Sequence, residues 1–174
     1  GDFAAYAAEK DLPPIEGAGS PAELNLMGRD IANTLLARAL GAPVVLVGDV
    51  ERGGVFASLY GTVRLLSPED RARITGLIIN KFHGDIRYIN PGPRLLEERL
   101  EQEEGRRIPV LGTVPALPLH LPEEDTAVNP FVGWDSPKRK ELDSGLDRLA
   151  DALEGSLDLE TLERQMRTMP DSLW

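Results

Sequence analysis

Three short apolar runs rich in β-branched residues are the most regular feature of the hydrophobic pattern. They span Val44–Val47, Leu77–Ile79 and Ile108–Leu111, and each is bounded by glycine, proline or a charged residue. Continuous apolar runs of this length are typical of strands that are buried on both faces. We therefore predict three buried strands.

The segments between these runs repeat apolar residues at helical spacing. The first set is Ile31, Leu35, Leu36, Ala39 and Leu40, the second is Val55, Leu59, Val63 and Leu66, and the third is Leu95, Leu96 and Leu100. Gly41 stands where the first helix would end, and Pro91 stands near where the third would begin. Alternating strands and helices indicate parallel pairing through helical crossovers. The predicted fold class is α/β, a mainly parallel sheet with flanking helices.

Both ends of the chain depart from this alternation. Leu12–Ile15, ahead of Glu16, is a further strand candidate, although its two prolines cannot donate to a ladder. Residues 129–138 are predicted to be irregular, and a second short helix is expected at 159–169. Before that helix, helical spacing resumes at Leu142, Leu146, Leu149 and Leu153. We expect residues 1–127 to form the main domain and residues 128–174 to form an irregular connector with a helical tail.

Charge and composition narrow the function classes. The sequence has 19 Lys and Arg against 29 Asp and Glu, a net charge of −10, which repels nucleic acid and anionic membranes. Neither is expected as a partner. The absence of cysteine excludes disulfides, thiolate metal sites and a thiol nucleophile. The sequence starts without a signal-peptide pattern, and its apolar runs are shorter than the roughly 20 residues of a membrane span. A cytoplasmic protein is expected.

The first candidate motif is the loop from Glu16 to Asn25. Ligands of open parallel sheets bind beside the carboxyl ends of the strands, so polar loops there are the first candidates. Gly17 and Gly19 permit close approach of the backbone to a ligand, and Glu16 could hold Mg²⁺ together with phosphates. The alternative is a glycine-rich turn that carries a solvated acid.

The second motif, Asp49–Ala57, joins a predicted strand end to a predicted helix start. Unpaired amides at a helix start favour a phosphate or carboxylate. Arg52 could bind that anion through two hydrogen bonds, and Asp49 could orient a metal ion or water. The alternative is an ion pair between Asp49 and Arg52 that braces a tight turn.

The third motif follows the second predicted strand, at Asn80–Asp85. The Asn80 amide can both donate to and accept from a purine edge. In the guanine-reading pattern Asn-Lys-x-Asp, the acid would stand at His83, whereas Asp85 lies two residues later. Adenine is therefore the favoured base. The alternative is an asparagine that caps a local turn.

The fourth motif, Pro109–Pro115, ends the third predicted strand in a turn that could flank a nucleotide base. The alternative is a plain β-turn. The sequence contains no Gly-x-x-x-x-Gly-Lys-Ser/Thr phosphate loop.

Taken together and in order, these motifs resemble the cobyric acid synthase family from roughly Asp11 to Ala127. The resemblance implies a synthetase domain related to dethiobiotin synthetase, within the P-loop NTPase class, followed by a glutaminase domain. It also implies a reaction, the amidation of peripheral carboxylates of adenosylcobyrinic acid a,c-diamide. ATP, expected with Mg²⁺, would phosphorylate a carboxylate, and ammonia from glutamine would displace the phosphate.

The resemblance also assigns roles to individual residues. The implied catalytic residues are Glu16, which would bind Mg²⁺, together with Asp49 and Arg52. The implied substrate-binding residues are Ser20, Glu23, Asn25, Gly53 and Gly54. Asn80 would read adenine, and Pro115 would flank the base.

Two parts of the family pattern are missing from the sequence. The phosphate loop belongs ahead of this segment, and the glutaminase cysteine is absent. We therefore expect a fragment truncated at its N-terminus, inactive alone and dependent on a glutaminase domain or a missing N-terminal segment. Its truncation would expose a strand edge, which a homodimer or the acidic tail would cover. The alternative is a non-catalytic subunit or degenerate paralogue that serves assembly or corrinoid binding. The related a,c-diamide-forming synthase is less favoured, because Ser20–Glu23 continues as in cobyric acid synthase.

Overall fold

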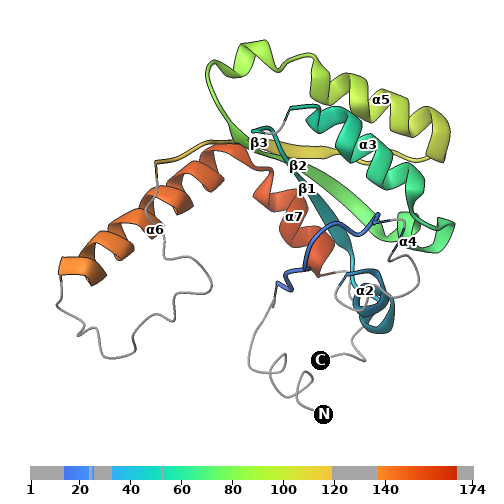
Figure 1. The fold of residues 1–174 in the computed structure, drawn as a ribbon, viewed down its shortest axis with the longest axis horizontal. Helices are drawn as coiled ribbons and strands as arrows, with labels where there is room; N and C mark the ends of the chain where they lie inside the picture. The colour runs from blue at the N-terminus through green and yellow to red at the C-terminus, as the bar shows by residue number, and fades with distance from the viewer. Residues whose placement is uncertain (1–13, 24, 26–32, 52, 119–136, 168–174) are drawn as a thin grey trace.

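A computed structural model describes residues 14–23, 25, 33–51, 53–118 and 137–167. In chain order its elements are α2 (Thr34–Leu40), β1 (Val44–Asp49), α3 (Val55–Leu65), α4 (Pro68–Arg73), β2 (Ile74–Phe82), the 3₁₀ helix η1 (Ile86–Tyr88), α5 (Gly92–Glu104), β3 (Val110–Pro115), α6 (Pro137–Ser156) and α7 (Leu159–Met166). Figure 1 shows their arrangement.

The strands form a parallel sheet in the order β1-β2-β3. Helices α3 and α4 connect the first two strands, and η1 and α5 connect the second two. Figure 1 shows α3 and α5 on one side of the sheet and α7 on the other. The predicted α/β class with parallel strands and flanking helices is confirmed.

The core lies between the sheet and the helices α3 and α5. It includes the predicted helical positions Val55, Leu59, Val63, Leu96 and Leu100. These side chains pack against Leu46, Leu77 and Ile79 from the strands. Burial of such side chains stabilises a domain by about 1.5–3 kcal/mol each, so this interface holds α3 and α5 on the sheet.

The strand boundaries differ from those predicted. Strand β2 is longer than expected and begins at Ile74, while β3 begins at Val110 and runs to Pro115. The expected turn at Gly112–Pro115 is therefore part of the strand. Ile108 is fully buried but precedes the strand, because Pro109 has no N–H to donate and contributes its carbonyl to Leu77 N instead, at 2.9 Å.

Helix α4 was not predicted. The Ser67 hydroxyl caps it by accepting from Asp70 N at 3.2 Å, and Pro68 stands in its first turn. Asp70 is buried, with 7% of its surface exposed, and receives a hydrogen bond of 2.6 Å from Arg38 Nε of α2. This ion pair joins the helix before the sheet to the connection between β1 and β2.

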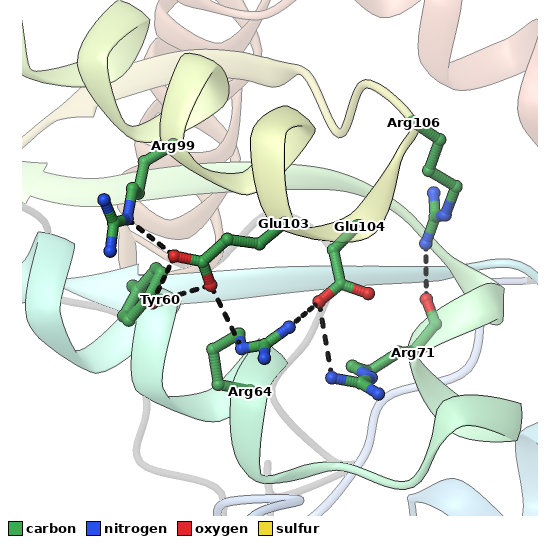
Figure 2. Close-up of polar contacts among 7 residues, drawn as sticks. All are labelled: Tyr60, Arg64, Arg71, Arg99, Glu103, Glu104 and Arg106. Atoms are coloured by element: carbon green, nitrogen blue, oxygen red, sulfur yellow. Dashed lines mark hydrogen bonds and ion pairs between the residues drawn. The ribbon is translucent and has the colours of Figure 1, made fainter.

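Figure 2 shows a second set of ion pairs, which ties the C-terminal end of α5 to α3 and α4. Glu103 accepts from Tyr60 Oη at 2.8 Å and pairs with Arg64 Nε at 3.2 Å. Glu104 pairs with Arg64 and, at 3.3 Å, with Arg71. Arg106 donates to the carbonyls of Ile74 and Arg71. These polar contacts lie next to the apolar contacts between α3 and α5, on the side nearer the amino end of β2.

The C-terminal helices pack against β3. Leu157, between α6 and α7, forms an antiparallel bridge with Gly112, and Asp158 N donates to Leu111 O at 2.7 Å. The tail therefore contacts β3, whereas Val47 of β1 is 60% exposed, and the covering of an edge left open by truncation stays a prediction. Helix α6 begins at Pro137, inside the stretch predicted to be irregular.

At the other end, Pro14 and Ile15 have no regular structure, so the additional strand is not found there; residues 12 and 13 lie outside the described part. Among the helices that the structure describes, none combines the length and apolar character needed to cross a membrane.

Candidate functional site at the carboxyl edge of the sheet

The sheet register brings three of the predicted site residues to one edge. Asp49 at the end of β1 is the direct partner of Asn80 in β2, and Phe82 is the partner of Pro115 at the end of β3. Val50 N extends the ladder by donating to Asn80 O at 3.1 Å. Asp49, Asn80 and Pro115 therefore lie at the same edge of the sheet, while their roles stay predictions.

The connection from β1 to α3, which the structure describes at residues 50, 51, 53 and 54, is called the β1–α3 loop below. Gly53 and Gly54 have φ values of 72° and 68°, in the left-handed region that glycine adopts without strain. Gly53 N donates to Val50 O at 2.9 Å, and Glu51 N donates to Asp49 Oδ1 at 2.8 Å. The Asp49 carboxylate is therefore tied to the loop that follows it. Arg52, the predicted anion-binding residue, lies outside the described residues.

Lys81, to which the sequence assigned no role, lies at the centre of the charged side chains on this edge. Its Nζ lies 2.9 Å from Asp49 Oδ2 and 3.1 Å from Glu51 Oε2. Hydrogen bonds to Asp49 and to Glu51 raise the pKa of the Lys81 ammonium, so the side chain stays charged at neutral pH. His83 Nε2 lies 3.6 Å from the other oxygen of Glu51. Asp49 is thus paired with Lys81 in the described structure.

The backbone at Lys81 is also unusual. Its φ is 58°, in the left-handed region, which costs a residue with a side chain roughly 1–2 kcal/mol. The strand register is interrupted between Ile79 and Phe82, where this residue lies. A strained residue beside a polar strand end is a common feature of functional sites. In the sequence, the left-handed conformation of Lys81 is indicated only by the preceding Asn80 and by the end of the strand nearby.

The side chain of Asn80 contributes to this turn. Its Oδ1 accepts from Lys81 N at 2.9 Å, as in the alternative prediction of a local capping role. Asn80 is partly buried and lies between Asp49 and the neighbouring β3. These observations do not test whether its side chain reads a base, so base recognition stays a prediction. Asp85 is used locally, because it caps η1 and pairs with Arg87.

The loop that begins at Glu16 makes its described contacts elsewhere. Ala18 O accepts from Asn33 Nδ2 at 2.8 Å, which ties the loop to the start of α2, and Ser20 Oγ accepts from Ala22 N at 3.3 Å. Glu16, Glu23 and Asn25 are exposed. Their roles, and the meeting of Glu16 with Asp49 and Asn80, stay predictions.

A magnesium ion fits this chain only in a limited way. In the described parts of the chain, no three acidic or histidine side chains are grouped to hold a metal. Magnesium that accompanies phosphates needs only one or two protein carboxylates, and the exposed carboxylate of Glu16 could supply one.

Comparison with known proteins decides the family. The family model described as an AAA domain matches residues 3–124. The chain belongs to this AAA domain family. The match includes all three strands and every predicted site residue, so the edge formed by Asp49, Asn80 and Pro115 is part of the shared domain.

Curated relatives carry a more specific name. The protein named cobyric acid synthase in Caldanaerobacter subterraneus subsp. tengcongensis is 49% identical to this chain over 75% of its length. The proteins of the same name in Listeria monocytogenes serotype 4a and Streptococcus sanguinis are 50% identical over 71% of this chain and 44% identical over 91% of it, respectively. The resemblance predicted from the motifs is confirmed. The AAA domain chain spans 24%, 23% and 30% of the lengths of these relatives. No solved structure gives a significant match.

Proposed function

We propose that this chain is part of an ATP-dependent and glutamine-dependent amidoligase of cobalamin biosynthesis, acting in the cytoplasm. Its substrate would be adenosylcobyrinic acid a,c-diamide, whose peripheral carboxylates would be amidated. The observation that carries the proposal is the close similarity to relatives named cobyric acid synthase, across a segment that includes the polar edge of the sheet. The chain alone would be inactive.

The chemistry requires two steps. A substrate carboxylate oxygen attacks the terminal phosphorus of ATP, which releases ADP and leaves an acyl phosphate. Ammonia, supplied from glutamine by another domain, then attacks the acyl carbon, loses a proton and expels inorganic phosphate. Catalysis of such steps depends on placing the reactants and on stabilising the charge of the transferring group.

The described residues divide among four tasks in this proposal. Asn80 and Pro115, from neighbouring strands, would hold the adenine base. The β1–α3 loop would present backbone amides near the start of α3 to the acyl phosphate, with Asp49 beside it. Ser20, Glu23 and Asn25 would contact the corrinoid, and Glu16 would hold the magnesium ion of ATP.

The decisive experiment uses the protein as its gene encodes it. The purified protein is given the a,c-diamide with ATP, magnesium and either glutamine or ammonia, and products are followed by mass spectrometry. We expect amidated products and stoichiometric ADP. With ¹⁸O in the substrate carboxylates, one labelled oxygen per amidation should appear in inorganic phosphate, as an acyl phosphate requires.

Two other outcomes would redirect the proposal. Amidation of cobyrinic acid in place of the a,c-diamide would indicate the a,c-diamide-forming reaction. Tight corrinoid binding without ATP turnover would indicate a non-catalytic subunit or degenerate paralogue.

A further inference from the structure

We propose that Lys81 is a positioning residue of the proposed site, which holds Asp49 and the β1–α3 loop in their working arrangement. The proposal starts from the two ion pairs of its ammonium, at 2.9 Å to Asp49 and 3.1 Å to Glu51. One of these carboxylates belongs to the last residue of β1, and the other belongs to the loop that follows it. A single side chain from β2 therefore ties the loop to the sheet.

The backbone supports this interpretation. Glycine adopts a left-handed φ most easily, yet the residue at this position is a lysine with a long cationic side chain. The left-handed conformation interrupts the register of β2 and β3 next to the point where the side chain reaches across to β1. A residue retained purely for folding would gain nothing from this strain, whereas an ammonium needed at this place would explain it.

The charges of Lys81 and of the two carboxylates also support a positioning role. The carboxylates of Asp49, at the end of β1, and of Glu51, in the loop, repel each other and any anion that approaches, and the Lys81 ammonium neutralises one of their two charges. The substrates of the proposed reaction are a triphosphate and a polycarboxylate, so both are anions. Without Lys81, the negative charges of Asp49 and Glu51 would face these anions with no ammonium between them, and the conformation of the loop would depend on weaker contacts such as that between Glu51 and His83.

The activity test rests on the proposed function, whereas a hydrogen-exchange test rests on the contacts alone. Lys81→Gly removes the ammonium and also relieves the strained φ. In the whole gene product we expect kcat for amidation to fall by about 10–100-fold, the range that follows misplacement of a catalytic group. The melting temperature should stay the same or rise. Lys81→Arg should restore part of kcat, because a guanidinium can still pair with Asp49 and Glu51.

Exchange is read at the loop amides of Val50, Glu51 and Gly53, which are hydrogen-bonded in the structure. We expect them to exchange at least about tenfold faster in Lys81→Gly, since opening of the loop exposes them. The control Arg167→Met removes a comparably exposed cation that pairs with Glu163 on α7. It should change neither the exchange of these amides nor kcat.

A double variant tests whether Lys81 acts through Asp49. Asp49→Asn combined with Lys81→Gly should have about the same kcat as Asp49→Asn alone, because residues that act as a unit are not additive. Multiplied losses would overturn the positioning role, and so would unchanged loop exchange. A fall in kcat that merely follows a fall in melting temperature would do the same. If the unmodified protein does not amidate while loop exchange responds as expected, the proposed function fails and the positioning role stands.

Discussion

A Cβ atom on Gly112 would lie 2.0 Å from the main-chain oxygen of Ser156, so only glycine lets the junction of α6 and α7 lie against β3. At this place Leu157 bridges to Gly112, and Asp158 N donates to Leu111 O. On α7, the Gln165 amide donates to Thr75 O at 2.8 Å, at the beginning of β2. The C-terminal segment is therefore joined to β3 by backbone contacts and to β2 by a side-chain hydrogen bond.

Gly112→Ala should lower the free energy of unfolding by about 1–3 kcal/mol, because the added methyl group cannot fit without moving backbone atoms. Urea denaturation measures the change. Gly155→Ala is the matched control on the same appendage. Its Cβ would meet nothing within 4 Å, and alanine in a helix should add about 0.5–1 kcal/mol. Equal effects of the two variants would show that the tail is not docked on β3.

Gly54→Ala should destabilise the protein by roughly 1–2 kcal/mol, because its φ of 68° is unfavourable for any residue with a Cβ. Gly54→Asn should cost less, since asparagine tolerates this region better. Gly61→Ala, in the interior of the same helix α3 and in open space, should stabilise by about 0.5–1 kcal/mol. Thermal unfolding ranks the three variants. A Gly54→Ala variant as stable as the parent would contradict the left-handed turn ahead of α3.

The sequence predicted the sheet well because its evidence was local. The runs at Val44–Val47 and Leu77–Ile79 do form strands, although burial on both faces was wrong for the first, because Val47 is 60% exposed. The helical spacing of Val55, Leu59 and Val63 matches the buried face of α3. The parallel order then follows from the connections. The shift of β3 depends on how Pro109 is paired with Leu77, which a single segment does not reveal.

The candidate site could be predicted only in part. Strand register explains why Asp49 and Asn80 meet, since both directly follow apolar runs. The role proposed for Lys81 rests on its left-handed backbone and on its ion pair with Asp49, and nothing in the residue type indicates that conformation. Helix α4 was missed for a different reason. Its Ser67-Pro68 start was visible in the sequence, but six residues carry too little hydrophobic periodicity to be noticed.

Tyr60→Phe should raise the pKa of the Glu103 carboxyl toward its ordinary value of 4.5. In the folded protein the hydrogen bond from Tyr60 holds that pKa down, and the nearby charges of Arg99 and Arg64 act in the same direction. NMR titration of the carboxyl carbon measures the shift. Tyr88→Phe removes the hydroxyl of a tyrosine that is 87% exposed and should leave the pKa of Glu103 unchanged. Identical titration curves in both variants would contradict the contact shown in Figure 2.

The Arg38–Asp70 pair should make stability depend on acid pH. The hydrogen bond from Arg38 lowers the pKa of Asp70 below its ordinary value of 3.8, with a smaller contribution from Ser67. Because the pKa of the folded state is the lower one, this stabilisation is complete above about pH 4 and is lost as the pH falls through the folded-state value.

Asp70→Asn should remove that part of the acid dependence. It should also lower the free energy of unfolding at pH 7 by about 1.5–3 kcal/mol, because the buried side chain loses its charge-assisted hydrogen bond from Arg38. Glu69→Gln is the control, because Glu69 reaches Arg38 only at 3.4 Å from an exposed position and should change stability by less than about 1 kcal/mol. Urea denaturation at a series of pH values between neutrality and the acid limit of folding gives both quantities. If the parent and Asp70→Asn lost stability with the same slope below pH 4, the acid sensitivity would have to come from other carboxylates, and the pair would not anchor α2 to α4.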